Sequence, residues 1–345
     1  MDVRYCSDSP RDGAAWDAYV ASRPDATSDH LWGWRRVLAE SFNFPPHYLA
    51  AVEGERCVGV LPLFLVPSGW GGTALCSIPF GNYGGILADS PAASSALLEA
   101  ATEMLHRTRA RYLELRHRSP LADARLSQPA GAHSRFALPL AGDAAAHWRA
   151  MGPDNRSKIQ RAKRRGLRLE ISRDPGPLYP IHLHASRRQG RPCFPRRYFE
   201  LILAMEGASA EVFYVTCEGR RIAYYLALFF RDAMVCQFAG SLAASHRSYP
   251  NEFLFWCGIE QACARGLREF DFCRSRTRSG TAAFKRKLRF EESPLDYQYA
   301  GPERPVLSAR SPSLERLLRS AGGVWTRLPV WCTRALGPRV VRYLT

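Results

Sequence analysis

The residues best able to do chemistry lie late in the sequence, between residues 274 and 289. This stretch carries five arginines, two lysines and no acidic residue. Such a run repels itself unless something anionic lies on it. Two readings stay open: a solvated basic loop, or a site that holds a phosphate, a carboxylate or a developing oxyanion.

Lys285 is the cation of this stretch that we single out. It lies in the tripeptide Phe284-Lys285-Arg286, after the small residues 280–283, which let a backbone come close to a substrate. Because its sequence neighbours are cationic, its charge has no local partner and should be available to an anionic group. The competing reading is one more surface cation.

A helix and a strand must position this stretch. Apolar residues at helical spacing predict a helix from residue 251, with Gly266 at its C-terminal end. Residues 270–272 alternate as in a short strand. Asp271 in the strand and Glu252 in the helix are candidate general bases, although they form no recognisable pair. The sequence shows no Ser-His-Asp or Cys-His arrangement for a covalent nucleophile.

The chain contains an internal repeat. Residues 52–64 resemble residues 217–230, each reading as a strand, a Glu-Gly turn and a returning strand. Residues 95–119 resemble residues 251–275, each reading as a helix and then a strand. Two copies in the same order predict two α/β domains of one fold, side by side. We place them at residues 1–150 and 151–300, followed by a tail at residues 301–345.

A glycine-rich stretch lies at residues 70–85. Its glycines permit backbone geometries and close approaches that other residues forbid. One reading is a substrate-facing loop that presents Asn82 and Tyr83; the other is a tight connection between strands. No phosphate-binding glycine motif of the P-loop or Rossmann type follows a strand here.

Two basic segments open the second expected domain. Residues 154–170 predict a short helix, capped by Asp154 or Asn155, with positive charge on nearly every side. Residues 186–199 interleave arginines with aromatic rings, which suits stacking on bases or sugars. A solvated helix face and core aromatics rimmed by arginines are the alternatives. The candidate nucleic-acid contacts are Arg156, Lys158, Arg161, Lys163, Arg164, Arg165, Arg187, Arg188, Arg191, Arg286 and Lys287.

Composition also indicates an anionic partner. The 345 residues carry a net charge of +16, which favours nucleic acid, an anionic membrane or a phosphorylated substrate. The longest apolar run, residues 222–230, is too short to span a bilayer, and the first residues lack the apolar core of a signal peptide. Ten cysteines without a Cys-x-x-Cys pair indicate reduced thiols in the cytoplasm and no metal site.

These features resemble the FemAB/FemX aminoacyltransferases. The resemblance rests on the tandem units, the basic helix RSKIQRAKRRG, the block PNEFLFWCGIEQACARGLREFDFCRSR and the element FKRKL. It extends from Trp16 to about Pro338 and is nearest to a small branch associated with PEP-CTERM/exosortase systems. It implies an α/β (α+β) fold of two tandem GNAT-like domains, each a mixed twisted sheet flanked by helices. Because no sustained heptads occur, the coiled-coil insertion of the larger members is absent.

The resemblance implies transfer of an amino acid from aminoacyl-tRNA to an amine or hydroxyl. The acceptor would be a small peptide, an antibiotic precursor or a cell-envelope precursor. Lys285 matches the lysine of the family's second-domain FK motif, at the acceptor site. Together with the readings above, this gives Lys285 and Asp271 as the expected catalytic residues. Substrate contacts are expected from Asn82, Tyr83, Arg274, Arg276 and Phe284.

The implied reaction is direct transfer without a covalent enzyme intermediate. It needs tRNA as a partner and no cofactor beyond the aminoacyl-tRNA itself. We expect a cytoplasmic monomer. The proline-rich and then basic, amphipathic tail should pack on the first domain, with peripheral membrane contact as an alternative.

Two other functions stay open. A CoA-dependent N-acyltransferase would share the fold, but such enzymes carry Arg/Gln-x-x-Gly-x-Gly/Ala at a helix N-terminus that holds pyrophosphate, and no such string occurs. A non-catalytic RNA- or membrane-associated protein would also explain the charge. The tandem repeat with its glycine-rich loop favours an enzyme.

Overall fold

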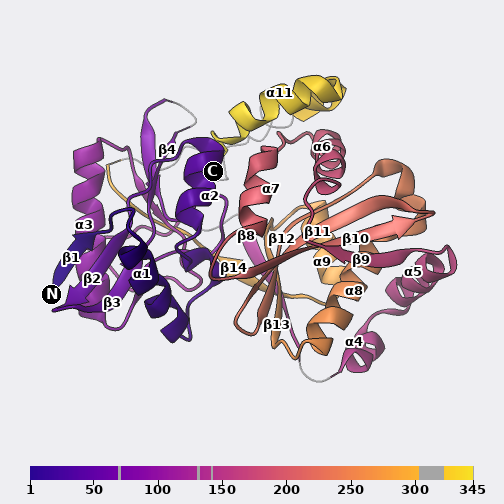
Figure 1. The fold of residues 1–345 in the computed structure, drawn as a ribbon, viewed down its shortest axis with the longest axis horizontal. Coiled ribbons are helices and arrows are strands. Elements are labelled where there is room, and N and C mark those ends of the chain that lie inside the picture. The colour runs from indigo at the N-terminus through magenta and orange to yellow at the C-terminus, as the bar shows by residue number, and fades with distance from the viewer. Residues whose placement is uncertain (69–70, 130–132, 141–142, 303–321, 345) are drawn as a thin grey trace.

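The computed structural model describes residues 1–68, 71–129, 133–140, 143–302 and 322–344. Two α/β halves lie side by side, and the helices of the C-terminal segment run along one edge (Figure 1). Both halves have the mixed sheets and flanking helices expected for tandem GNAT-like domains.

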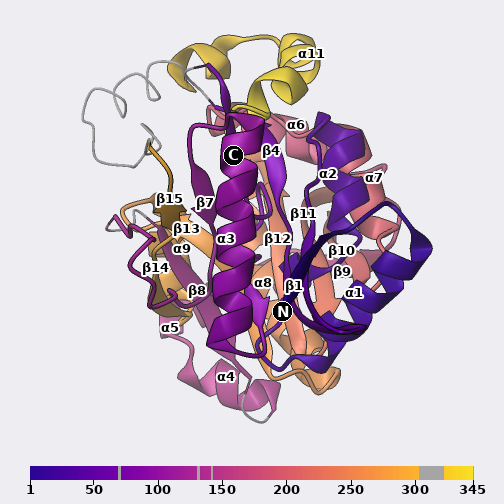
Figure 2. The same cartoon turned by 90° about the vertical axis from the view of Figure 1, so that its left-hand side faces the viewer.

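The first half contains two four-stranded sheets. One is ordered β1-β2-β3-β6 and the other β15-β7-β5-β4, and β15 (Gln298–Ala300) comes from far along the chain. Helix α3 packs against strands of both sheets and covers the core between them (Figure 2). The elements are β1 (Asp2–Tyr5), α1 (Pro10–Ser22), a 3-10 helix (Ser28–His30), α2 (Trp34–Phe42), β2 (Leu49–Glu53), β3 (Arg56–Leu61), β4 (Phe64–Pro67), β5 (Thr73–Cys76), β6 (Leu87–Ala88), α3 (Pro91–Thr108) and β7 (Leu113–Leu115).

The second half is built on one seven-stranded sheet, ordered β14-β8-β13-β12-β11-β10-β9. Its strands alternate between two cores: Phe213 and Tyr225 face the core under α8, whereas Tyr214 and Tyr224 face the core under α6 and α7. The elements are β8 (His133–Pro139), α4 (Ala144–Ala150), α5 (Pro153–Arg164), β9 (Arg168–Ser172), α6 (Leu178–Arg188), α7 (Arg196–Leu203), β10 (Ser209–Cys217), β11 (Arg220–Phe230), β12 (Ala233–Ser241), a 3-10 helix (Ala243–Ser248), α8 (Pro250–Ala264), β13 (Glu269–Arg276), α9 (Gly280–Lys287), β14 (Glu291–Leu295) and β15 (Gln298–Ala300).

The internal repeat is visible in the sheet topology. Each half has an antiparallel hairpin, β2–β3 or β10–β11, whose turn contains a glycine at positive φ, Gly54 or Gly219. Each half also has one parallel strand pair, β5 with β7 and β12 with β13, whose connection contains the long helix α3 or α8. The two repeated units are thus the same local structure built twice.

The two halves exchange strands. β8 precedes residue 150 but pairs with β13 and β14 in the second half's sheet. β15 ends at residue 300 but pairs with β7 in the first half's sheet. The sequence-based boundaries at residues 150 and 300 therefore cut across both sheets, because strand pairing here follows contacts between distant segments.

The C-terminal segment packs mainly on the second half, which differs from the expectation that it lies on the first. Helix α11 (Val330–Val341) contacts α6, and its buried Gly337 leaves no room for a side chain, since a Cβ there would lie 2.4 Å from the sulfur of Cys193. The thiol of Cys193 in turn contacts the carbonyl oxygen of Thr333 at 3.2 Å. Among the described helices, none has the length and apolar composition to cross a bilayer.

One core spans both halves and contains a buried histidine. His182 on α6 accepts a hydrogen bond at Nε2 from the backbone N–H of Phe194 (3.1 Å), which places the ring proton on Nδ1, where it is donated to the hydroxyl of Tyr224 (2.9 Å). Burial lowers the pKa of His182 to about 3 and that of His117 to about 4. Both imidazoles are therefore neutral in the folded protein near neutral pH.

These histidines predict acid destabilisation. Above pH 6.5 these two histidines are neutral in both the folded and the unfolded protein. As the pH falls below 6.5, the unfolded chain binds protons that the folded chain does not, so the free energy of unfolding decreases. At pH 5 we expect each of the two to lower the free energy of unfolding by about 2 kcal/mol. Urea denaturation at pH 7.5 and 5 measures this. His182→Gln should reduce the pH dependence, whereas exposed His184→Gln should not; equal slopes would refute this origin.

Candidate functional site

The candidate site lies where strands β12 and β13 separate. These parallel strands pair through Asp271 and then diverge, although both continue for several residues. On its other side, β13 changes register with β8 between Asp271 and Arg274, and Cys273 adopts a positive φ of 57°. Phe272 and Cys273 are thus paired by neither neighbouring strand, which leaves their backbone carbonyls in need of other partners.

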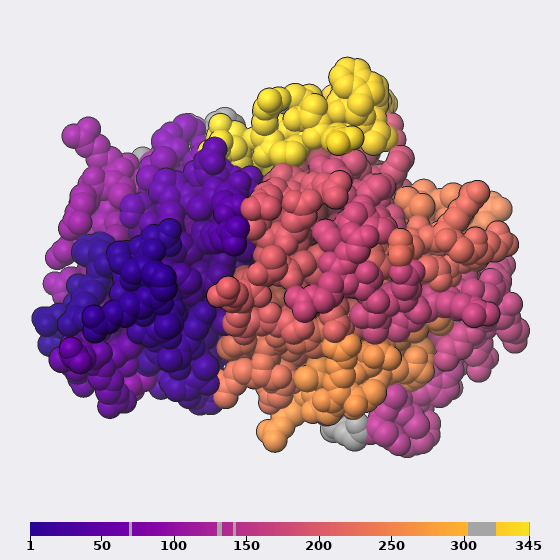
Figure 3. Space-filling model, in the orientation of Figure 1, coloured from indigo at the N-terminus to yellow at the C-terminus, as the bar shows by residue number. Residues whose placement is uncertain are grey.

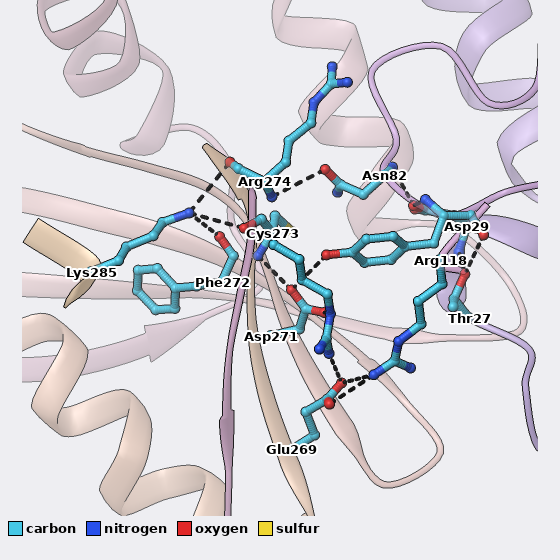
Figure 4. A network of polar contacts seen from close by, with 12 residues as sticks. Thr27, Asp29, Asn82, Arg118, Glu269, Asp271, Phe272, Cys273, Arg274 and Lys285 are labelled. Atoms are coloured by element: carbon cyan, nitrogen blue, oxygen red, sulfur yellow. Dashed lines mark hydrogen bonds and ion pairs between the residues drawn. The ribbon is translucent and has the colours of Figure 1, made fainter. Parts of the chain in front are cut away.

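Lys285 supplies those partners. Its ammonium donates to the carbonyl oxygens of Phe272 (2.5 Å) and Cys273 (3.2 Å), with that of Arg274 at 3.5 Å (Figure 4). The side chain is 4% exposed, and burial lowers its pKa. The expectation of an unpartnered charge on a basic loop is therefore wrong. The segment instead forms helix α9. Side chains three and four residues apart lie on the same face of a helix, and Lys285 lies on the buried face of this one.

Asp271 joins the two halves. One oxygen accepts the backbone N–H of Cys273 (2.6 Å) and the hydroxyl of Tyr83 (3.3 Å); the other accepts Nε of Arg135 (2.9 Å). Burial raises the pKa of this carboxyl, and the charge of Arg135 opposes the rise. Since both oxygens are occupied, the geometry supports a clamp rather than a general base.

The ionic network extends from this clamp to the edge of the site. Glu269 contacts Arg135 at 2.6 Å and Arg118 at 2.9 Å, so an arginine from β8 and one from the first half converge on β13 (Figure 4). Arg135 was missed by sequence reasoning. Its one sequence signal is a cation within a strand of mostly apolar residues.

Residues 77–85 of the glycine-rich stretch are a largely buried connection at the junction of the halves, in agreement with the second reading above, whereas Gly71 and Gly72 are exposed. Asn82 and Tyr83 are each 4% exposed, and the side-chain oxygen of Asn82 lies 3.4 Å from the backbone nitrogen of Arg274. The carboxylate of Asp29, also missed, accepts the backbone N–H groups of both residues at 2.6 and 2.8 Å. Arg116 donates to the carbonyl of Gly81 at 3.0 Å. The loop thus positions β13 and does not offer an open face.

A cluster of arginines lies at the far end of β13. Arg276 pairs in register with His133, and desolvation together with the charges of Arg274 and Arg276 lowers the pKa of His133 to about 3. Desolvation and the charge of Arg276 also lower the pKa of Arg191. Arg274 donates to the hydroxyl of Tyr297 (3.0 Å), whereas Arg191 and Arg276 have no acidic partner among the described residues. Like charges held together in this way repel one another, and an anion placed between them would relieve the repulsion.

The remaining candidate residues are distributed between the core and the surface. Phe284 is half-buried and packs on Phe255 with ring centroids 5.4 Å apart, against the second half's core. Glu252 lies in the first turn of α8, where its carboxylate is 3.9 Å from Lys158. The cap of α5 is Gly152 and not Asp154 or Asn155; the Asn155 side chain instead donates to the carbonyl of Lys287.

The basic residues proposed for nucleic acid fall into three groups. Carboxylates neutralise three of them: Lys158, Lys163 and Arg286. Backbone carbonyls hold three others without neutralising them: Arg156, Arg165 and Arg187. Five have no side-chain partner among the described residues: Arg161, Arg164, Arg188, Arg191 and Lys287.

The connection from β12 to α8 leads into the N-terminus of the long helix of the second half. Residues 242–249 contain no glycine, and Pro250 at the start of α8 has no N–H to donate. Within the part of the chain that is described, no three His, Cys, Asp or Glu side chains gather as metal ligands. A surface groove of about 450 Å³ between α6 and the β10–β11 turn contains none of the candidate site residues.

Comparisons with known proteins agree with this architecture. Residues 154–286 match the family model described as an acetyltransferase (GNAT) domain. The structure is similar to the crystal structure of FemX, with a TM-score of 0.63 at 15% identity over 86% of this chain and 97% of that one. A comparison with curated proteins finds no match.

Two further solved structures share the fold. One is the C-terminal domain of a proposed lysylphosphatidylglycerol synthetase from Agrobacterium fabrum, with a TM-score of 0.58 at 15% identity over 85% of this chain and 92% of that one. The other is a tandem GNAT protein from the clavulanic acid biosynthesis pathway, with a TM-score of 0.56 at 13% identity over 88% and 99%. The chain is thus a tandem GNAT-like α/β protein, and residues 154–286 form a GNAT-type acyltransferase domain.

Proposed function

We propose that this acyltransferase moves an amino acid from aminoacyl-tRNA to an amine or hydroxyl of a small peptide, an antibiotic precursor or a cell-envelope precursor. In this proposal it is a FemAB-like enzyme that acts as a cytoplasmic monomer and needs no cofactor beyond the aminoacyl-tRNA. The observation that best supports this proposal is the set of cations on the second half that no carboxylate neutralises. They include Arg161 and Arg164, exposed on α5.

The charge distribution supports a large polyanion as the donor carrier. An arginine held by a backbone carbonyl keeps its full charge, so Arg165 adds to the field of its unpaired neighbours on α5. Each phosphate contact releases counterions, and many weak contacts together give affinity. The resemblance to FemAB/FemX sequences and the shared fold with FemX support a tRNA as that polyanion.

The proposed reaction is attack of the acceptor on the aminoacyl ester carbonyl, with the ribose oxygen leaving. The chain has to hold both substrates in register and stabilise the oxyanion that develops. The arginines at the end of β13 would bind the acceptor's phosphate or carboxylate. Lys285 fixes the backbone of residues 272–274 and so positions Arg274.

The proposal predicts salt-dependent tRNA binding. The logarithm of the binding constant should fall with the logarithm of salt concentration by about 0.7–0.9 for each phosphate contact. Reversing charge at Arg161 and Arg164 should weaken all tRNAs alike, by about tenfold or more at low salt, and reduce that slope. Gel shift across a salt series measures both. Lys158→Gln, on the same helix but already paired with Asp154, is the matched control and should have the smaller effect. Binding that is insensitive to salt would contradict the proposal.

The donor distinguishes the proposal from the CoA-dependent alternative. Incubation with a mixture of charged tRNAs and small-peptide acceptors should give a product heavier by one aminoacyl residue, and ribonuclease should abolish it. Acetyl-CoA should not replace the charged tRNA, because the β12–α8 connection lacks the glycines, and α8 lacks the first N–H, that would hold pyrophosphate. Turnover with acetyl-CoA would favour the alternative.

A further inference from the structure

The described C-terminal segment, residues 322–344, concentrates the exposed apolar surface of the molecule. Nine large apolar side chains are exposed in the described residues, and six of them lie here: Val324, Trp331, Leu336, Val340, Tyr343 and Leu344. Trp331 is 72% exposed. A monomeric protein rarely gathers so much apolar surface unless something covers it.

The opposite face of the same segment is already buried. Thr333, Gly337 and Val341 recur every four residues along α11 and lie against the protein. Arg187 of α6 donates to the carbonyl of Leu328 and anchors the chain just before this helix. The exposed apolar residues therefore do not pack into the described core of the protein. They are spread around the exposed side of α11 and over the residues on either side of it, and the segment as a whole runs as a ridge along one edge of the molecule (Figure 3).

The charge of this ridge has one sign. Arg327, Arg334 and Arg339 are exposed and Arg342 is half-buried, and residues 322–345 contain no acidic residue. Indole and phenol rings favour the boundary between water and lipid, and arginines beside them attract anionic headgroups. We infer that the ridge of residues 322–344 binds the surface of an anionic lipid bilayer.

The ridge adjoins the arginine cluster. Gly190, next to Arg191, approaches Gly322 so closely that a Cβ on Gly190 would lie 2.9 Å from the Gly322 Cα. A protein resting on a bilayer through this segment would therefore hold Arg191 near the headgroups. α5, with its proposed tRNA contacts, lies away from the ridge (Figure 1). The inference does not depend on the identity of the donor.

Flotation of the full chain with lipid vesicles tests the inference. The protein should float with vesicles of phosphatidylcholine and phosphatidylglycerol, more weakly with phosphatidylcholine alone, and the binding should fall with salt. Trp331→Ser and the double variant Arg334→Glu with Arg339→Glu should each weaken flotation, the latter by at least about tenfold. Ile171→Ser and Arg220→Glu change an exposed apolar side chain and an exposed arginine elsewhere, and should float as the parent does.

Gel shift with tRNA on the same variants separates this inference from the proposed function. The ridge variants should bind tRNA normally. The inference is overturned if the parent does not float with anionic vesicles, or if the ridge variants float as well as the controls. It is also overturned if the ridge variants lose tRNA binding together with flotation, or if light scattering shows a dimer that they dissociate, since the ridge would then serve RNA or a second copy.

Discussion

Replacing Lys285 with alanine is expected to lower the free energy of unfolding by about 3–5 kcal/mol and to reduce transfer by about a hundredfold or more. The stability loss follows from the carbonyls of Phe272 and Cys273, which would stay buried without a donor at roughly 1–3 kcal/mol each, together with a cavity left by the side chain. The rate loss follows because residues 272–274 connect the Asp271 clamp to Arg274, so a shift of this backbone misplaces both. Urea denaturation and single-turnover transfer measure the two effects separately.

Two further variants show whether position or charge matters at Lys285. Lys287→Ala removes an exposed lysine from the same helix and should change stability by less than about 0.5 kcal/mol. Lys285→Arg should recover only part of the loss, since a planar guanidinium does not replace a compact ammonium among three carbonyls. Unchanged stability in Lys285→Ala would contradict the carbonyl contacts. Unchanged transfer in a folded variant would remove Lys285 from the catalytic machinery.

Reversing the charge of Arg276 is expected to weaken use of a phosphorylated or carboxylated acceptor by about 10- to 100-fold, mainly through KM. The estimate corresponds to one charge-assisted hydrogen bond replaced by repulsion, about 1.5–3 kcal/mol. This prediction about the acceptor rests on the proposed function. A second readout is independent of activity: Arg276→Glu should raise the pKa of His133 from about 3, because one of the charges that lowers it is replaced by its opposite. NMR titration of the histidine ring measures this shift.

Arg278→Glu is the matched control for Arg276. It makes the same change at an exposed arginine two residues further along the chain, and Arg278 is not among the charges that act on His133. The control should leave both the acceptor KM and the pKa of His133 closer to those of the parent. If Arg276→Glu leaves the pKa of His133 unchanged, Arg276 does not lie close to His133 and the proposed arginine cluster does not exist. If that pKa rises while KM stays constant, the cluster exists but does not bind the acceptor.

Local sequence determined the repeated units of this protein. The helix Pro250–Ala264 and the hairpin β10–β11 follow from apolar spacing and from glycines that tolerate positive φ. Such signals involve residues that are close together in the sequence, so they can be recognised without knowledge of the fold. The same is true of the net charge, whose location on exposed helices such as α5 was also predictable from its sparse apolar residues.

Only the tertiary structure decided what the candidate residues contact. Asp271 is 136 residues from Arg135 and 188 from Tyr83. Lys285 reaches carbonyls that are unpaired because β12 diverges from β13 and β8 changes register with it. The sequence showed Lys285 among other cations. Whether its ammonium is solvated or buried depends on the loss of strand pairing at residues 272 and 273, which the sequence does not reveal. The exchange of β8 and β15 between the halves has the same cause, because β8 pairs with β13 and β14 and β15 pairs with β7, all of them strands far away in the chain.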